Sequence, residues 1–416
     1  MKKIIALFIA ALVIMSLAAC AGTGIETTPS ATAPVAEEPT ATAAESAPAV
    51  EAAPSLSLDE ITVNYAYDRS WPEETLKIGI VLFNPTDSTW LSVKEYYDYL
   101  ASIFNIEFIY SETISSPEEE FKFVDSCAAA GCKGIYAYYN ASGPSIIMEA
   151  TNLGMYYVGV ADYYDRFLDN PYYVGGYSFV GKDGLSGDYT AGYALGYNLA
   201  KQDVKHIVYA SGETKVKMMN ERAQGFYDGV AAAQAEGVTA LFDPAKDVIG
   251  GWPDAPTFPA LQTAALTSDY DAVGSATDIA YWFQPVEDIG KQMKMACIGS
   301  VSDTYKSYVE NGIVSVIVYD APEIVHGAPM IMLINCCTGH PELAKNADGT
   351  PRLQHVVRWT IDSPGLFNEI YNKHKAGEYY VSIENTVKLL GGLDPDASIV
   401  LMDQVYDISM EQALGK

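Results

Sequence analysis

The feature that most constrains the fold is an alternation of short apolar runs with segments of helical spacing, which begins at Leu76. Leu76–Phe83 is a nearly continuous apolar run, as expected for a parallel strand that is covered on both faces. A polar loop and a helical segment at Val93–Phe104 follow, and the pattern then repeats. Such alternation predicts parallel sheets with right-handed crossover connections. The fold class is therefore expected to be α/β.

The expected strands are too numerous for one compact doubly wound sheet, so two Rossmann-like lobes with a cleft between them are expected. The expected strands are 76–83, 106–110, 134–138, 155–160, 206–210, 239–242, 272–276, 295–299 and 314–319. The expected helices are 93–104, 117–130, 144–152, 189–201, 222–236, 259–266, one from about 279, 302–312 and 330–336. In the tail, Gln354–Trp359 and Ser398–Val405 look like short strands, and Gly365–Lys375 looks like a helix.

The N-terminus has the pattern of a bacterial lipoprotein signal. Two lysines precede an apolar run from Ile4 to Leu17, which is too short for a comfortable membrane span and is followed by small residues. Leu17–Cys20 then resembles a lipobox, in which the residues before the cysteine are removed and its thiol is diacylated. We expect residues 1–19 to be a signal peptide and Cys20 to carry the lipid. The alternative is an ordinary signal peptide with a chance cysteine.

Residues 20–58 are expected to form a lipidated tether without regular structure. Between Ala21 and Ser57 the chain holds little besides Ala, Thr, Pro, Glu, Ser, Val and Gly, and such a segment cannot bury enough surface to offset its ordering entropy. Loss of two lysines with the signal would change the formal charge from −28 to −30. A surface this acidic repels nucleic acid and anionic lipid. We therefore expect an extracytoplasmic domain that the membrane holds only through the lipid, with no nucleic-acid partner.

Besides Cys20, the chain has five cysteines, an odd number with no C-x-x-C pair. Cys127 and Cys132 lie near the end of one expected helix and could form a disulfide, although two small buried thiols are favoured. Cys336 and Cys337 are neighbours in an apolar helix, and adjacent cysteines rarely bridge. The sequence predicts neither a disulfide framework nor a zinc site.

No catalytic motif stands out. The chain lacks a G-x-S-x-G elbow, a Walker loop, a G-x-G-x-x-G after a strand and an H-E-x-x-H helix. Its five histidines show no metal-ligand spacing. A glycosidase could hide among the many carboxylates, because its two acids need not be near in sequence. A protein without catalysis, metal or cofactor is nevertheless expected.

One α/β unit, Val180–Val230, ends with an isolated arginine just past a strand. The strand His206–Ala210 is followed by a polar loop, and Arg222 lies at the start of the next helix. In open α/β sheets, ligands bind beyond the carboxyl ends of the strands. The stretch therefore marks a candidate binding site.

Several blocks of sequence, taken in order, resemble the type I periplasmic solute-binding proteins, the sugar-binding group that serves ABC importers. The blocks are Ile78–Val81 with Asp87–Trp90, Gly134–Tyr138 with Ala150–Met155, Val160–Asp162, Arg222–Phe226, and Asn311–Pro322. The resemblance covers roughly Lys77 to Asp320 and is weak in the tail. It implies two lobes, residues 75–180 with 321–352 and residues 181–320 with 353–416. Three crossovers would join them, near Val180–Gly181, near Asp320 and near Arg352.

The resemblance also implies which side chains contact a solute. Arg222 would place its planar fork on vicinal hydroxyls or a ring oxygen. Asp162 would accept hydrogen bonds from two hydroxyls, and Trp90 would stack on a pyranose or a base. Each has a plain structural alternative, respectively a helix-start arginine, a strand-end cap and a core aromatic. The implied ligand-binding residues are Asp87, Trp90, Tyr138, Asn140, Asp162, Arg222, Asp278 and Asp320.

The chain departs from the family pattern at two positions. Tyr163 stands where many members have an arginine after the aspartate, and Gly299–Val301 stands where many have Gly-Phe-Asp. Other residues thus stand at two positions that typically contact hydroxyls, and Ser302 or Asp303 could substitute at the second. The ligand could therefore be a nucleoside, a modified sugar or another polar small molecule as well as a simple sugar.

These features predict a monomeric, membrane-anchored substrate-binding lipoprotein of an ABC importer, with a sugar-like ligand and a permease as partners. A ligand-sensing receptor of the same fold, for an autoinducer or a nucleoside, is the alternative. A surface carbohydrate-active enzyme is a weaker one. A cytoplasmic repressor of this fold is excluded, because the chain begins with a lipoprotein signal and not with a helix-turn-helix.

Overall fold

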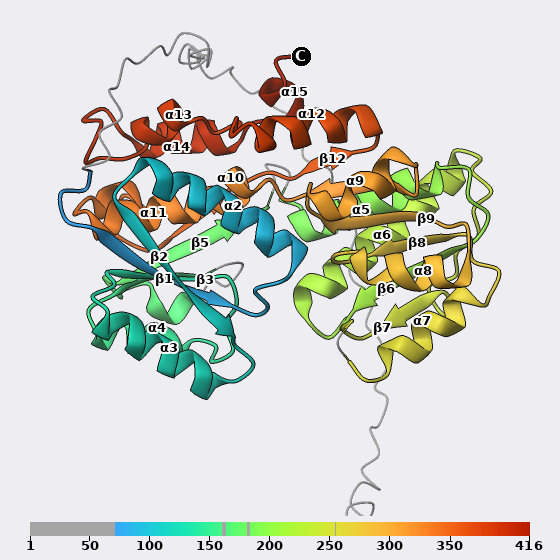
Figure 1. The fold of residues 1–416 in the computed structure, drawn as a ribbon, viewed down its shortest axis with the longest axis horizontal. Helices are drawn as coiled ribbons and strands as arrows, with labels where there is room; N and C mark the ends of the chain where they lie inside the picture. The colour runs from blue at the N-terminus through green and yellow to red at the C-terminus, as the bar shows by residue number, and fades with distance from the viewer. Residues whose placement is uncertain (1–70, 160–163, 181–183, 254) are drawn as a thin grey trace, which may run out of the picture. The chain divides into compact units, whose positions relative to one another are not determined.

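The computed structural model of the protein describes residues 71–159, 164–180, 184–253 and 255–416, which contain two six-stranded sheets (Figure 1). The first sheet has the order β11-β5-β4-β3-β1-β2 and the second the order β12-β10-β9-β8-β6-β7. The strands of the first sheet are β1 Leu76–Leu82, β2 Ile106–Thr113, β3 Gly134–Ala137, β4 Tyr156–Gly159, β5 Tyr173–Ser178 and β11 Arg352–His355. Those of the second are β6 Ile207–Gly212, β7 Val248–Gly250, β8 Ala272–Ser275, β9 Lys294–Gly299, β10 Val314–Tyr319 and β12 Trp359–Ile361.

The strand pairs are parallel, apart from the antiparallel pair of β10 with β12. Two α/β lobes built on mostly parallel sheets are therefore confirmed. The prediction of a strand at 239–242 is wrong about its position. Leu241 makes only a single bridge to His206, and the edge strand β7 forms at Val248–Gly250.

Helices cover both faces of the first sheet, because alternate residues of its buried strands point to opposite sides. Ile78 and Ile80 belong to the core beneath α2 Ser88–Ile103 and α11 Gly327–Cys337. Val81 and Ile135 belong to a separate core beneath α3 and α4. The remaining helical elements of this lobe are α3 Pro117–Ala129, α4 Ser145–Asn152, η2 Asp165–Phe167, α10 Pro322–Val325 and η4 Pro341–Leu343.

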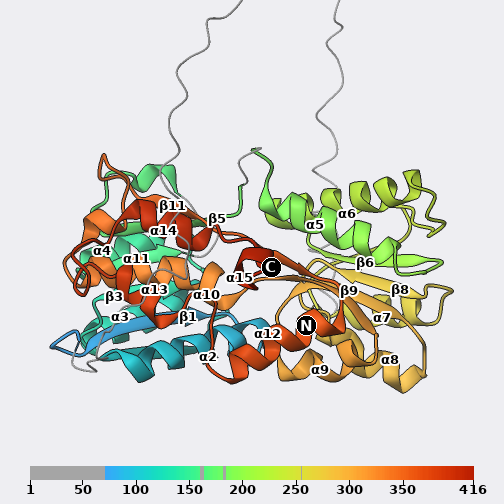
Figure 2. The same ribbon diagram turned by 90° about the horizontal axis from the view of Figure 1, so that it is seen from above.

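The second sheet is covered in the same way. Figure 2 shows α5 Gly187–Ala200 and α6 Lys217–Ala235 side by side on one face, with α7, α8 and α9 on the other. Tyr209 packs under α5 and α6, while Val208 faces the other core. The helical elements of the second face are α7 Phe258–Leu266, η3 Ala280–Trp282, α8 Phe283–Ile289 and α9 Asp303–Glu310.

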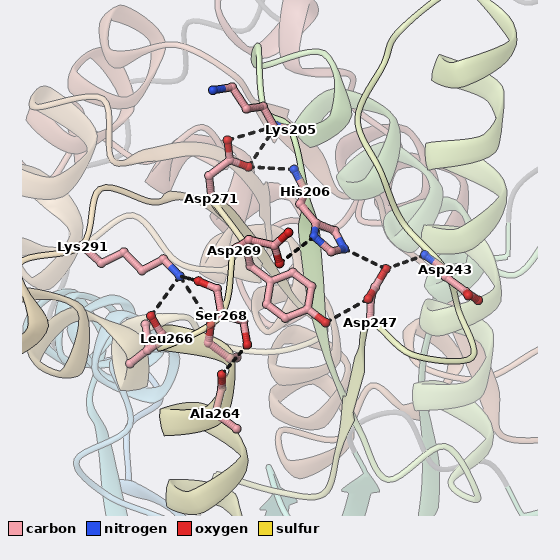
Figure 3. Close-up of polar contacts among 12 residues, drawn as sticks. Lys205, His206, Asp243, Asp247, Ala264, Leu266, Ser268, Asp269, Asp271 and Lys291 are labelled. Carbon is pink, nitrogen blue, oxygen red and sulfur yellow. Dashed lines mark hydrogen bonds and ion pairs between the residues drawn. The ribbon is translucent and has the colours of Figure 1, made fainter.

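Polar contacts fix the amino ends of the second sheet (Figure 3). The Asp271 carboxylate accepts hydrogen bonds from the backbone N–H groups of Lys205 and His206, at 2.9 Å for each shorter contact. The Lys291 ammonium donates to the carbonyls of Leu266 and Ser268 at 2.9 and 2.7 Å, beyond the last turn of α7. A cation at a helix C-terminus is stabilising. This cluster therefore has a structural role at the edge opposite the strands' carboxyl ends.

The chain passes between the two sheets three times. β5 of the first sheet leads to α5 of the second lobe, β10 leads back to α10, and β11 leads to β12. The third passage follows His355 and not Arg352, because the strand that begins at Arg352 pairs in parallel with β5. The assignment of Leu353–His355 to the second lobe is therefore wrong.

The C-terminal segment contacts both lobes and is not simply part of the second. Tyr371 of α12 donates to Asp303 of α9, whereas Asn335 of α11 donates to the Leu389 carbonyl at 2.8 Å. The expected strand at Ser398–Val405 is wrong. Ser398 caps a helix there, with Met402, Val405 and Tyr406 buried at helical spacing. The helices are α12 Pro364–Lys375, α13 Ile383–Lys388, α14 Ile399–Tyr406 and α15 Met410–Ala413.

Cys127 and Cys132 are free thiols, as are Cys297, Cys336 and Cys337, and four of these five side chains are buried. The favoured description of Cys127 and Cys132 as small buried thiols agrees with the structure. Within the described ranges, no helix combines the length and apolar character needed to cross a membrane.

The backbones of helices α5 and α6 are in direct contact at positions occupied by glycines. A Cβ atom added to Gly192 would lie 2.0 Å from the Arg222 carbonyl oxygen, and one on Gly225 would lie 2.0 Å from the Tyr189 carbonyl oxygen. Gly196 and Gly229 continue this contact one turn further along each helix. Since no side chain fits between the two backbones, the glycines set the separation of the helices.

Gly225→Ala should therefore destabilise the protein. Its methyl group would push α6 away from α5, at a cost of about 2 kcal/mol or more. Gly365→Ala on α12 is the matched control, because a Cβ there meets no atom within 4 Å and alanine favours helix. The free energy of unfolding from urea titrations measures both. Equal stability of the two variants would contradict this account of the helix pair.

Candidate functional site

Polar residues gather where the strands of both sheets end. Asp87 and Ser88 follow β1, Asn140 follows β3, Asp278 follows β8, and Ser300 follows β9. Helices α5 and α6 add Asp188 and Arg222, and the passages between the lobes add Asp320 and Arg358. Ligands of open α/β sheets bind at the carboxyl ends of strands, so these residues form the candidate site.

Arg222 is 6 % exposed and held by protein atoms. Its Nε donates to Asp188 Oδ1 at 2.9 Å, and its Nη1 donates to the Ala276 carbonyl at 2.7 Å. The close packing of α5 and α6 brings the two charged residues together. The strand-end position predicted for Arg222 is thus observed, and its planar fork is already held in one orientation.

A second buried arginine, Arg358, joins the same network. Its Nε donates to Asp320 Oδ1 at 2.6 Å, and its Nη1 donates to Asp188 Oδ1 at 3.0 Å. Its guanidinium also lies over the Phe179 ring, 3.5 Å from the centroid. Cation–π and charge-assisted contacts are both strong in a desolvated setting.

These contacts tie together all three passages between the lobes. Phe179 follows β5, Asp320 follows β10, and Arg358 lies between β11 and β12. Asp320 was predicted to contact a solute. In the structure its carboxylate pairs with Arg358 at the hinge through Oδ1.

The charges in this network stabilise one another. Burial raises the pKa of Asp188, but the charges of Arg222 and Arg358 outweigh this and hold the pKa below its usual value. Burial lowers the pKa of Arg358, but Asp320 and Asp188 together hold it above its usual value. Asp188 and Arg358 therefore stay ionised at neutral pH.

Asp87 and Ser88 bring the first lobe to the second lobe's strand ends. Asp87 is the N-cap of α2 and accepts from the Trp90 N–H at 2.9 Å. The Ser88 hydroxyl donates to Asp278 Oδ2. Burial raises the pKa of Asp87 to about 6, against its cap hydrogen bond, and the charge of Asp278 adds to the rise.

Asp278 is buried and well provided with hydrogen bonds. Besides Ser88, the Tyr305 hydroxyl and the Ala280 N–H donate to its Oδ1, both at 2.6 Å. Its position at the end of β8 matches the prediction. Because three protein groups already donate to Asp278, it can accept fewer hydrogen bonds from a solute than Asp87 can.

Trp90 lies in the aromatic core of the first lobe and is 1 % exposed. Its ring meets those of Tyr97, Tyr110 and Tyr138 edge-on, with centroids 6.2, 5.7 and 5.3 Å apart. A solute therefore finds no open indole face, and this placement argues for the core alternative over the stacking role. Spacing alone does not tell a core aromatic from one in a cleft.

Tyr138 and Asn140 lie beyond β3, as predicted. Tyr138 packs between Trp90 and His326, whose ring centroid is 5.3 Å away. Burial lowers the pKa of His326 to about 4, so this histidine is neutral. The Asn140 amide donates to the Tyr157 hydroxyl at 3.2 Å, while its Oδ1 is buried with no hydrogen-bond partner.

Two predicted residues, Asp162 and the lipidation site Cys20, lie outside the described residues. Conversely, sequence reasoning missed Asp188, Ser88 and Arg358. Asp188 carried a signal, since it is an acidic residue in the first turn of the helix that follows the first crossover. Arg358 carried only the weak signal of an isolated cation between two short strands.

Two cavities bear on where a solute could bind. One of about 500 Å³ is open and lies between α2 and the segment joining α12 to α13, away from the strand ends, with Tyr99, Tyr379 and Glu384 in its wall. The other, of about 10 Å³, has room for about one water molecule. Asp278, Ser275 and Thr277 line it at the ends of the second sheet. We place the site at the smaller cavity because the charged network and both lobes meet beside it.

The described residues contain no group of three or more His, Cys, Asp or Glu side chains that could hold a metal ion.

No protein-family model matches the chain, and no curated protein matches it in sequence. Solved structures do match in fold. A periplasmic sugar-binding protein from Pseudomonas fluorescens aligns with a TM-score of 0.56 and 14% identity, over 81% of this chain and 99% of its own.

An ABC transporter solute-binding protein from Bacillus halodurans with bound myo-inositol aligns with a TM-score of 0.52 and 14% identity, over 72% of this chain and 98% of its own. The chain has the fold of type I periplasmic binding proteins. The transcription regulator CcpA of Lactococcus lactis shares it, with a TM-score of 0.52 and 15% identity over 70% of this chain and 98% of its own. At these identities the similarity shows the fold alone, and function has to be argued from the site.

Arg358→Met should destabilise the protein strongly. It would leave Asp320 buried without its cation and remove the contact with Phe179, at a cost of about 3–5 kcal/mol. Lys201→Met is the control, because the ion pair of Lys201 with Glu236 is exposed and should contribute less than about 1 kcal/mol. Urea unfolding compares the two variants. A loss for Arg358→Met as small as for Lys201→Met would refute the hinge network.

Proposed function

We propose that the protein is an extracytoplasmic substrate-binding lipoprotein of an ABC importer, which binds a sugar or sugar-like polar molecule between its lobes. The observation that carries this proposal is the meeting of polar strand-end residues from two lobes, Asp87, Asp278 and Arg222, beside a hinge made of three chain passages. The similar solved structures include sugar-binding proteins and an ABC transporter solute-binding protein, which supports the proposal.

Binding would work by bending at the hinge. A solute held by Arg222 of the second lobe and Asp87 of the first would draw the lobes together. The Ser88–Asp278 hydrogen bond, which joins the two lobes, supports closure at these surfaces. A permease would then recognise the liganded form, so the protein itself needs no catalytic group and would act as a monomer.

A regulator of this fold reads DNA, but a chain with a formal charge of −28 repels the phosphate backbone. A receptor that signals instead of feeding a permease would use the same site. Genes for a permease and an ATPase beside the gene for this protein would favour import.

Some polar small molecule should raise the melting temperature of the protein. A thermal-shift screen of sugars, sugar derivatives and nucleosides identifies it, and calorimetry gives its Kd. Arg222→Ala should weaken that Kd about tenfold or more, the loss expected for charge-assisted hydrogen bonds. Asp188 would keep Arg358 as a partner in this variant, so folding should survive.

The matched control is Arg166→Ala, whose guanidinium lies over the Phe167 ring in η2. This variant should bind with unchanged affinity. The proposed site would be contradicted if no molecule in the screen stabilised the protein, or if the Arg222→Ala variant bound the solute with unchanged affinity.

The lipid anchor is tested separately. In a bacterial host with lipoprotein processing, mass spectrometry of the mature N-terminal peptide should find a diacylated Cys20. Cys20→Ser should release the protein from the membrane fraction, because a single chemical group supplies the anchor. An unmodified N-terminal peptide at another cleavage site would contradict it.

A further inference from the structure

Among the described residues, the charges at the strand ends are not balanced. Arg222 pairs with Asp188, and Arg358 pairs with both Asp188 and Asp320. These two arginines and two aspartates neutralise one another. Asp87 and Asp278 are left over, and no ion pair joins either of them to a lysine, arginine or histidine in the described ranges 71–159, 164–180, 184–253 and 255–416.

The two leftover carboxylates are close neighbours across the lobes. Ser88 directly follows Asp87 in the chain, and its hydroxyl donates to Asp278. The charge of Asp278 contributes to the raised pKa of Asp87. Two carboxylates that share a partly dry site destabilise each other's charged form unless a cation lies between them.

The two acids differ in what they can still accept. Asp278 already accepts hydrogen bonds from Ser88, Tyr305 and Ala280. Asp87 accepts from the backbone at its cap position through Oδ1, and a carboxylate offers about four acceptor positions. Asp87 can therefore contact a donor directly, while Asp278 contributes mainly its charge.

We propose that the solute carries a positively charged amine, which donates to Asp87 and lies in the field of Asp278, as in an amino sugar or another hydroxylated amine. This inference rests on the proposed function and narrows its substrate class. A neutral sugar would leave both carboxylates uncompensated, and a sugar phosphate or sugar acid would be repelled. The formal charge of −28 would also draw a cationic solute toward the protein.

Two buried polar groups at the strand ends would suit the hydroxylated part of such a solute. The Ser300 hydroxyl is fully buried after β9 and has no hydrogen-bond partner, and the same holds for the buried Oδ1 of Asn140 after β3. Buried polar atoms without partners are rare in proteins and need an explanation. One lies in each lobe, so hydroxyls of a bound solute would satisfy both.

The experiment compares matched pairs of probes by calorimetry at pH 7.5. Each pair is an amino sugar and its neutral parent: D-glucosamine with D-glucose, D-galactosamine with D-galactose, and D-mannosamine with D-mannose. The N-acetylated forms are included, because they keep the nitrogen but lose its charge. At least one amine should bind about tenfold or more tightly than both neutral counterparts, and added salt should reduce the difference.

Asp87→Asn is the decisive variant, since asparagine keeps the N-cap of α2. It should remove the tenfold preference for the amine while leaving the melting temperature of the free protein unchanged or higher. Asp125→Asn, an exposed position on α3, is the control and should keep the preference.

The outcomes separate the two proposals. Neutral sugars that bind as tightly as their amines, or a preference that survives Asp87→Asn, would overturn the cationic solute and leave the binding function intact. Failure of every amine, neutral sugar and nucleoside to bind would overturn both.

Discussion

The buried guanidinium of Arg358 is the contact on which the arrangement of the two lobes depends. It lies between two strands of different sheets and reaches an aspartate on another passage, an aspartate on α5 and the ring of Phe179 on the third passage. A buried cation is costly unless it is fully paired. Each of these partners comes from a different part of the chain, so the pairing is complete only when all three passages lie together. The hinge is thus defined by an electrostatic requirement and not by loop length.

The candidate site is built outward from this hinge. Asp188 joins Arg358 to Arg222, and the glycine contacts of α5 and α6 hold the helices that carry Asp188 and Arg222. The same two arginines are thereby neutralised within the protein. The charges left without an ion-pair partner among the described residues are those of the two carboxylates that the lobes bring together, Asp87 and Asp278. Because Arg222 and Arg358 are paired with Asp188 and Asp320, the unpaired charge of the candidate site is negative.

Much of the fold could be predicted because its strands are continuous apolar runs such as Leu76–Leu82, which only a sheet covered on both faces explains. Asp278 could be placed because it follows a strand closely, and Arg222 because it lies in the helix that comes after a strand and a short polar loop. Trp90 could not, since an aromatic at helical spacing reads the same in a core and in a cleft. Arg358 and the helix at Ser398 could not either, because the tail has short elements whose partners lie far away in the chain. Tertiary contacts decide whether each of these tail segments forms a helix or a strand and which residues it contacts.

The central claim is that a solute binds where Asp87 and Ser88 of one lobe meet Asp278 and Arg222 of the other. A crystal structure with the solute found by screening tests it most directly. The account predicts density between the strand ends, with the Arg222 guanidinium and the Asp87 carboxylate within hydrogen-bond distance of the solute. A solute found instead in the open cavity of about 500 Å³ beside Tyr99 and Tyr379 would contradict it.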